Sequence, residues 1–244
     1  MLEINRVSKT YPNGVCALEA LTLTVALGEI VAVVGGSGCG KSTLLRLASG
    51  LDAPTEGAII LDGDAITAPH EKIGIVFQEP RLLPWRSVED NIRLVLPAHE
   101  ADADFGDLLE TLGLASHLGR YPGELSLGLA RRVAIARAFA IRPDFLLLDE
   151  PFVSLDEAVA DRLRDELVAL TTRTRITTLF VTHDLSEAVR LADRLFFLAD
   201  RPTHIIFESA LPPPRGSRSK DAIAAIGDDM RKQLARAKAD AEKH

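Results

Sequence analysis

The chain has 244 residues, 47% of them hydrophobic, and a formal net charge of −7. This length fits one large domain, or one domain with an inserted subdomain, and the apolar content is enough for a substantial core. The acidic balance argues against nucleic acid as the main partner. The two cysteines, Cys16 and Cys39, lack metal-ligand spacing and indicate a reducing, cytosolic environment.

The start of the sequence, Met-Leu-Glu-Ile-Asn-Arg, lacks the basic region and apolar stretch of a signal peptide. No apolar run approaches the roughly 20 residues that a helix needs to span a bilayer. We therefore expect any link to a membrane to go through a partner protein.

The first third of the chain is predicted to be rich in strands. Alternating and β-branched runs indicate strands at residues 2–7, 21–27, 30–34, 58–61 and 73–77. Turn residues separate the early strands, at 12–14, 27–29 and 62–64. One helix-like run, at residues 43–50, follows the third strand.

The middle of the chain is predicted to be helical, and the last third alternates strand and helix. Helical periodicity covers residues 88–96, 105–112, 127–140, 155–170 and 185–191. Further strands are predicted at 145–148, 177–181, 195–198 and 204–207. This order predicts an α/β domain over residues 1–211, with a β-rich edge and an inserted helical subdomain at about 84–141.

The tail, residues 212–244, differs in composition. Three prolines at 212–214 stop regular structure, residues 215–220 are polar, and residues 221–243 form a charged helix candidate. Two interpretations stay open: a surface helix or frayed terminus, or a docking or regulatory segment.

A phosphate-binding loop lies between the third strand and the first helix. Residues 35–42 read Gly-Gly-Ser-Gly-Cys-Gly-Lys-Ser, which fits the pattern G-x-x-x-x-G-K-[ST]. Its glycines let backbone N–H groups turn inward around a phosphate, and the following helix directs its positive end at the same anion. The predicted nucleotide-binding residues here are Gly35, Gly36, Ser37, Gly38, Cys39, Gly40, Lys41, Ser42 and Thr43.

Two acids end the apolar run at residues 145–148. Asp149 and Glu150 would lie at the carboxyl end of a buried strand, where α/β sheets place their ligands. Asp149 is predicted to hold Mg²⁺, and Glu150 to orient and polarise an attacking water. The alternative is that both acids merely cap the strand.

In order along the chain, these motifs resemble the ATP-binding cassette (ABC) family, over nearly the whole sequence up to about Leu211. The resemblance implies further roles. Tyr11 would stack on adenine, Gln78 would touch Mg²⁺ together with Ser42, Ser126 and Gly128 would form the signature, Asp156 would lie at the dimer interface, and His183 would contact the γ-phosphate. Taken singly, Tyr11, Gln78 and His183 could each be ordinary packing, strand-end or capping residues.

The resemblance implies the family's P-loop NTPase fold, with an antiparallel β subdomain and an inserted helical subdomain. It also implies ATP hydrolysis with Mg²⁺, and a head-to-tail dimer that holds two ATP molecules. The second subunit would be either another copy or a paralogue.

The signature departs from the family pattern Leu-Ser-Gly-Gly-Gln. Leu127 replaces its first glycine and Leu129 its glutamine, whereas Ser126 and Gly128 remain. One interpretation is a working motor with adjusted packing, which the presence of Glu150 and His183 favours. The other is a weakened composite site and a slow or regulatory ATPase.

Residues 77–88 resemble the ATPases of importers for nitrate, alkanesulfonates and taurine. That resemblance implies membrane permease subunits, a periplasmic solute-binding protein as an indirect partner, and a peripheral place at the cytoplasmic face of the inner membrane. Leu82, Leu83 and Trp85 would form an apolar lip for a helix of the permease, or else pack the helical subdomain.

Two other assignments are weighed. The chain could serve an exporter or lipid-transfer complex, because a free-standing ATPase can serve either direction. A non-transport cassette protein of DNA repair or translation is disfavoured, because the chain has neither a long coiled-coil insertion nor a second cassette.

Overall fold

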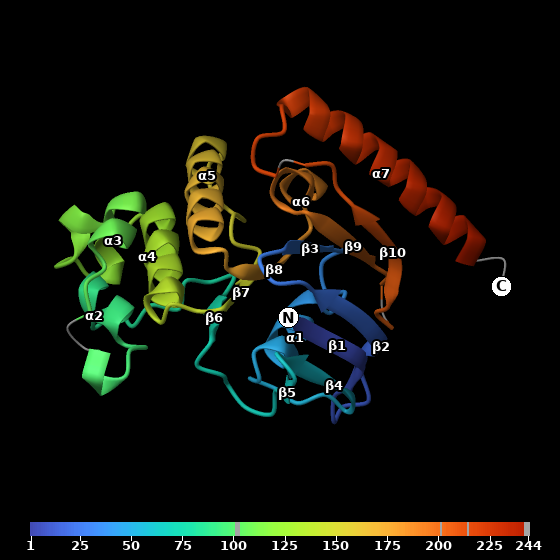
Figure 1. Ribbon diagram of the computed structural model, residues 1–244, viewed down its shortest axis with the longest axis horizontal. Coiled ribbons are helices and arrows are strands. Elements are labelled where there is room, and N and C mark those ends of the chain that lie inside the picture. Colours follow the sequence, from blue (N-terminus) through green and yellow to red (C-terminus); the bar gives the residue numbers. More distant parts are fainter. Residues whose placement is uncertain (101–102, 201, 214, 242–244) are drawn as a thin grey trace. The chain divides into compact units, whose positions relative to one another are not determined.

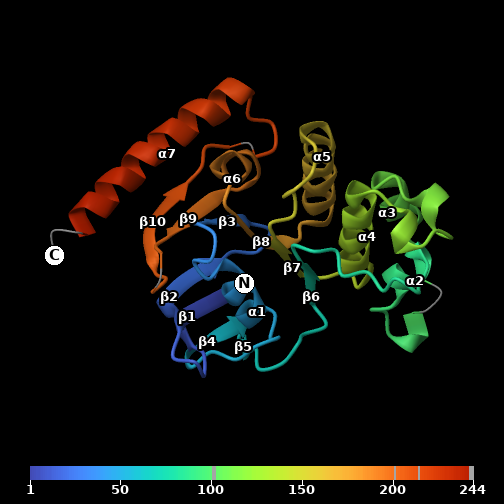
Figure 2. The ribbon, with the colours of Figure 1, turned by 180° about the vertical axis from the view of Figure 1, so that it is seen from behind.

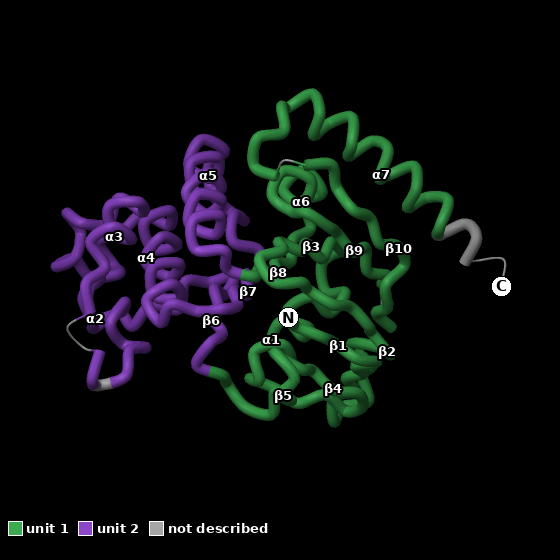
Figure 3. The backbone as a smooth tube through the Cα atoms, viewed as in Figure 1, with its two compact units in different colours: residues 1–70, 177–244 green, residues 71–176 purple. Residues whose placement is uncertain are grey.

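The computed structural model describes residues 1–100, 103–200, 202–213 and 215–241. The chain forms two compact units (Figure 3). The first joins residues 1–70 to residues 177–244, and the second consists of residues 71–176. The predicted helical insertion at about 84–141 falls within the second unit.

An antiparallel sheet opens the first unit. Strand β1 (Leu2–Thr10) lies between β2 (Cys16–Val25) and β4 (Glu56–Leu61), and the short β5 (Asp64–Ala65) pairs with β4. Leu2, Ile4 and Val7 of β1 are buried. Strand β5 begins at the end of the turn predicted at residues 62–64. Its two residues are too few to form an apolar pattern, so the sequence does not predict this strand.

The remaining strands of the first unit surround β3 (Ile30–Val34). It pairs in parallel with β8 (Thr177–Thr182) and β9 (Arg194–Leu198), and β10 (Ile205–Ala210) lies antiparallel to β9. All residues of β3 and β8 are buried, which explains their continuous apolar and β-branched sequences. Helices α1 (Lys41–Ala48) and α6 (Leu185–Leu191) follow β3 and β8 along the chain.

The tail folds back onto this unit. Helix α7 (Lys220–Ala241) packs against α6 and β10 (Figures 1 and 2). Ahead of it, Arg218 donates to the carbonyl oxygens of Val189 and Ala192, and Arg215 pairs with Asp193. These bonds satisfy carbonyls at the end of α6, which the helix itself leaves unpaired. The predicted helix extended to Lys243, and residues 242–243 lie outside the described residues.

The second unit combines two parallel strands with helices. Strand β6 (Ile73–Val76) pairs with β7 (Phe145–Asp149). The α-helices are α2 (Val88–Arg93), α3 (Gly106–Thr111), α4 (Leu127–Ala140) and α5 (Glu157–Thr174), and the 3-10 turns are η1 (Ala98–Glu100), η2 (Ala115–His117) and η3 (Pro122–Glu124). Helix α2 packs against α4, and α4 against α5.

Several helix boundaries differ from the prediction: α1 covers Lys41–Ala48 rather than residues 43–50, α3 covers Gly106–Thr111 rather than residues 105–112, and α5 ends at Thr174 rather than residue 170. Helix α2 ends at Arg93 rather than residue 96, and the next two apolar side chains, Leu94 and Val95, are exposed. Helix α5 begins at Glu157 rather than residue 155, because Asp156 takes the extended conformation of an N-cap. Among the described residues, no helix is both long and apolar enough to cross a membrane.

Candidate nucleotide-binding site

The glycine-rich loop joins β3 to α1 within the first unit. Gly38 and Gly40 have positive φ angles of 77° and 105°, in the region that favours glycine. A Cβ at Gly40 would also lie 2.8 Å from the Ala17 carbonyl oxygen. Residues 36–38 are exposed, so the loop presents backbone N–H groups to an incoming anion.

Lys41 places its charge inside the curve of this loop. Its Nζ donates to the carbonyl oxygens of Gly35 (2.9 Å) and Gly36 (2.8 Å), and the residue is 5% exposed. A buried ammonium at a helix N-terminus makes the loop strongly attractive to phosphate. Ser42 is exposed in the first turn of α1, and Thr43 follows it.

Thr203 supports the glycine-rich loop through the loop's backbone, and the sequence alone does not predict this contact. Thr203 is fully buried, its hydroxyl donates to the Cys39 carbonyl, and its own carbonyl accepts from the Glu19 N–H (2.9 Å). Cys39 is buried as well, and burial raises the pKa of its thiol although Lys41 opposes the shift. A lone threonine more than 160 residues away carries no pattern that could have identified this contact.

Tyr11 and His183 belong to the same unit as the loop. The Tyr11 hydroxyl lies 3.1 Å from the Thr43 hydroxyl, and Lys9 Nζ lies 5.3 Å from the centre of the Tyr11 ring. His183 is exposed in the turn between β8 and α6. Next to it, Asp184 caps α6 by accepting from the Ser186 N–H (2.7 Å). The histidine is thus held on a short, capped turn.

The two predicted acids lie at the end of β7 in the second unit. Asp149 is the last residue of the strand and is 8% exposed. Glu150 follows with a φ of 44°, a left-handed conformation that costs free energy in a residue with a Cβ. Gln78 is exposed two residues after the end of β6, the neighbouring strand.

The altered signature keeps the geometry of a helix N-terminus. Ser126 is the N-cap of α4, and its side-chain oxygen accepts from the Leu129 N–H (3.3 Å). Leu127 is the first helical residue, and 42% of it is exposed. A Cβ at Gly128 would lie 2.8 Å from Val159 Cγ1, so this retained glycine lets α4 approach α5. Asp156, the N-cap of α5, is exposed.

Known proteins match both the sequence and the fold. A family model described as "ABC transporter" matches residues 18–153. An aliphatic sulfonates import ATP-binding protein of Burkholderia cenocepacia is 44% identical over 92% of this chain and 83% of its own. A nitrate import ATP-binding protein of Synechococcus elongatus is 40% identical over 91% and 85%.

Solved structures agree with these relatives. The ATP-binding cassette MJ0796, a dimer in a post-hydrolysis state bound to ADP and phosphate, superposes with a TM-score of 0.77 at 31% identity. The match covers 88% of this chain and all of that one. The chain therefore belongs to the ABC transporter family and has its P-loop cassette fold. As a member of that family it binds and hydrolyses ATP, which confirms the predicted fold and activity.

Proposed function

We propose that this chain is the ATPase subunit of a bacterial importer for a small solute of the nitrate, sulfonate or taurine type. It would work as a dimer at the cytoplasmic face of the inner membrane, on permease subunits that receive solute from a periplasmic binding protein. The main support is the similarity, at 40–44% identity over almost the whole chain, to import ATP-binding proteins for sulfonates and nitrate.

A groove in the second unit supports a permease partner. It has a volume of about 290 Å³, and its lining includes Phe77, Arg81 and Arg137 together with the exposed Leu94 and Val95. An apolar groove with a basic rim suits a short amphipathic helix from a membrane protein.

Directly after Arg81 of the groove in sequence, the predicted apolar lip is partly exposed. Leu82 and Leu83 are half-buried, and Trp85 is 70% exposed. The buried amide of Asn91 accepts from the Leu83 N–H (2.7 Å) and donates to the carbonyls of Leu83, Arg86 and Ser87. These bonds fix the turn that carries Trp85.

The proposed roles follow from the chemistry of the donors. The glycine-rich loop and Lys41 would bind the phosphates, and Tyr11 would stack on adenine. Ser42, Gln78 and Asp149 would hold Mg²⁺, because Mg²⁺ prefers oxygen ligands. Among the described residues, no three His, Cys, Asp or Glu side chains cluster so as to hold a metal ion by themselves. When bound, Mg²⁺ would neutralise charge on the phosphates.

In hydrolysis, the oxygen of a water attacks the γ-phosphorus and the bond to ADP breaks. Glu150 would orient this water and accept its proton, and His183 would contact the γ-phosphate. Ser126 and Gly128 of a second subunit would complete the site, and Asp156 would lie at the dimer interface. Because Ser126 still caps α4 through the Leu129 N–H and both Glu150 and His183 are present, we favour a working motor over a weakened regulatory ATPase.

The first experiment combines solution mass and turnover. Glu150→Gln should lower ATP turnover by about 100-fold or more and give a dimer with Mg-ATP but a monomer with Mg-ADP. Glu110→Gln, an exposed acid on α3, is the matched control and should behave as the unmodified protein. Undiminished turnover in Glu150→Gln would refute the role of Glu150, and a monomer in both nucleotides would refute the homodimeric motor.

The importer assignment has its own test in detergent-solubilised native membranes. The tagged chain should capture an integral-membrane permease, and the double variant Leu94→Asp and Val95→Asp should lose it while retaining ATP turnover. Leu27→Asp introduces the same change at an exposed leucine of the other unit and should retain capture. Capture that survives the double variant would exclude this groove as the docking site.

A further inference from the structure

The loop that begins at Glu150 contains two residues in left-handed conformation without being glycine. Glu150 has a φ of 44° and Ser154 a φ of 61°. Within the loop, the Val153 N–H donates to the Glu150 carbonyl at 3.3 Å. Left-handed residues that carry a Cβ persist where the surrounding structure holds them, so contacts from outside the loop bear on this conformation.

Arg131 of α4 supplies that support. Its Nη1 donates to the Glu150 carbonyl (3.3 Å) and its Nη2 to the Val153 carbonyl (3.0 Å). The two nitrogens of one rigid guanidinium thus bridge the two ends of the turn. We call this pair of bonds the Arg131 clamp.

Overall stability is a poor explanation for this arginine. The residue is 3% exposed, and in the described part of the chain its Nε has no hydrogen-bond partner. Burial lowers the pKa of the guanidinium, and only the Glu150 carboxylate opposes the shift. An apolar side chain would avoid this desolvation penalty. What the arginine uniquely provides is the fixed spacing of its two donors.

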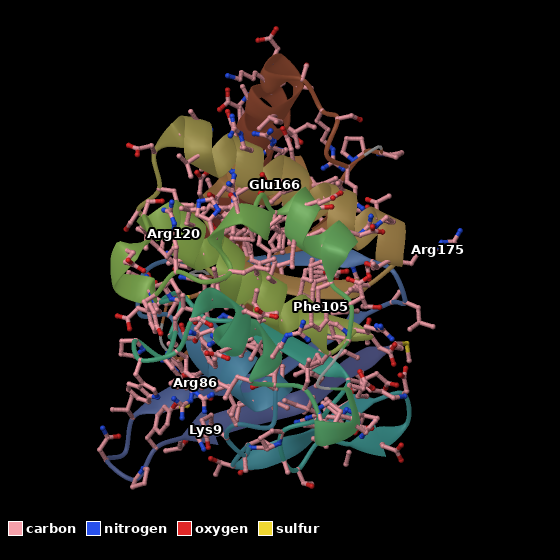
Figure 4. The ribbon with its side chains drawn as sticks, turned by 90° about the vertical axis from the view of Figure 1, so that its left-hand side faces the viewer. Lys9, Arg86, Phe105, Arg120, Glu166 and Arg175 are labelled. Carbon is pink, nitrogen blue, oxygen red and sulfur yellow. The ribbon has the colours of Figure 1, made fainter. Side chains whose placement is uncertain are left out.

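The next arginines of α4 make different contacts. Arg132 pairs with Glu166 on α5 (2.9 Å), and Glu166 is labelled in Figure 4. Arg137 donates to the carbonyls of Pro80 and Arg81, on the segment after Gln78. Arg131 alone among these three reaches the loop of the proposed water-orienting carboxylate.

We propose that Arg131 is a positioning residue for hydrolysis, which fixes the backbone of Glu150 so that its carboxylate points at the attacking water. The helix that carries it begins at the signature residues Ser126 to Gly128, five positions or fewer from Arg131. A shift of the signature on contact with ATP would therefore be passed along α4 to Arg131, and from Arg131 to the backbone of Glu150. The inference rests on the role of Glu150 given under the proposed function.

Two variants test the clamp. In Arg131→Gln the shorter side chain can reach at most one of the two carbonyls. Arg131→Lys keeps the positive charge but loses the planar pair of guanidinium donors. Both should lower kcat by about 10- to 100-fold, because a displacement near 1 Å has that effect on an oriented reaction. The dissociation constant for ATP should stay within about twofold, since the phosphate loop is untouched. Both variants should also accumulate the ATP-bound dimer.

A double-variant cycle separates positioning from general damage. If Arg131 acts through Glu150, then adding Arg131→Gln to Glu150→Gln should not lower the residual single-turnover rate further. Arg132→Gln removes an equally large cation from the same helix and serves as the control, with a lower melting temperature but a kcat within about twofold of the original.

Three results would overturn the proposal. The first is an unchanged kcat in Arg131→Lys and Arg131→Gln. The second is that Arg131→Gln lowers the single-turnover rate by the same factor in Glu150→Gln as in the original protein. Parallel losses of ATP affinity and kcat would indicate a general structural role instead. If Glu150→Gln itself retains full turnover, the assignment of the water-orienting carboxylate fails first, and the two failures are thus distinguishable.

Discussion

The phosphate loop and the loop after β7 both contain left-handed backbone conformations, and each achieves this differently. The phosphate loop uses glycine at the residues concerned, Gly38 and Gly40, and offers backbone N–H groups to its ligand. The loop after β7 uses Glu150 and Ser154 instead, and an arginine from a neighbouring helix holds it. A loop that binds its ligand through backbone N–H groups can use glycine at its left-handed positions. A loop that acts through a carboxylate needs a side chain at that position and cannot use glycine.

The largest effect is expected where glycine is indispensable. Gly40→Ala would place a Cβ 2.8 Å from the Ala17 carbonyl and 3.0 Å from Leu18 Cδ2, at a φ of +105°. We expect ATP affinity to fall by about 100-fold or more, because the loop must move to relieve the clash. Titration with a fluorescent ATP analogue measures the loss. Gly63→Ala, another positive-φ glycine with open space around it, is the control and should bind normally.

A second glycine is required by packing rather than by its own conformation. In Gly128→Ala the new methyl group would meet Val159 Cγ1 at 2.8 Å and push α4 away from α5. We expect turnover to fall by about tenfold, since the helix that carries Arg131 shifts. Adding Val159→Ala should restore most of it by removing the opposing methyl groups. A double variant as poor as the single one would show that the defect lies elsewhere.

The two cysteines give a milder probe of the phosphate loop. Cys39 is 2% exposed and burial raises the pKa of its thiol, so less thiolate is present at a given pH. Cys16 is half-buried. At pH 8 we expect an alkylating reagent to modify Cys16 at least about tenfold faster, as followed by mass spectrometry. Equal rates would mean that the loop opens readily without nucleotide.

The smallest effect is expected at a left-handed residue without a catalytic task. Arg175, labelled in Figure 4, ends α5 with a φ of 53° and is exposed. Arg175→Gly should raise the free energy of unfolding by about 0.5 to 1 kcal/mol. Glycine removes the backbone strain of the folded state, and the larger conformational entropy of glycine in the unfolded chain offsets only part of that stabilisation. Thermal unfolding checks this, and unchanged turnover would confirm that the strain at Arg175 has no role in hydrolysis.

Much of this architecture could be predicted from the sequence. The bounds of β3, α4 and α6 match the prediction, because their apolar periods end at clear signals such as the glycine-rich loop after Val34 and Ser126 before α4. The phosphate loop was found because its chemistry depends on residues adjacent in sequence. The roles of Glu150, His183 and Gln78 stay predictions.

Contacts between distant residues could not be predicted in this way. The Arg131 clamp depends on α4 meeting a loop 19 residues further on, and Thr203 supports Cys39 across 164 residues. Neither contact leaves a pattern in a single sequence. The apolar spacing at Leu94 and Val95 predicts a longer helix than α2, because such spacing does not distinguish a buried face from an exposed apolar one.

The turn held by Asn91 has a practical consequence. Trp85 is the single tryptophan of the chain, and its indole lies mostly in water on a fixed backbone. The intrinsic fluorescence of the protein therefore comes chiefly from one solvated ring, four residues along the chain from Arg81 of the groove. A peptide or permease segment that covers this ring would shift its emission to shorter wavelength, so docking can be followed in real time without attaching a dye.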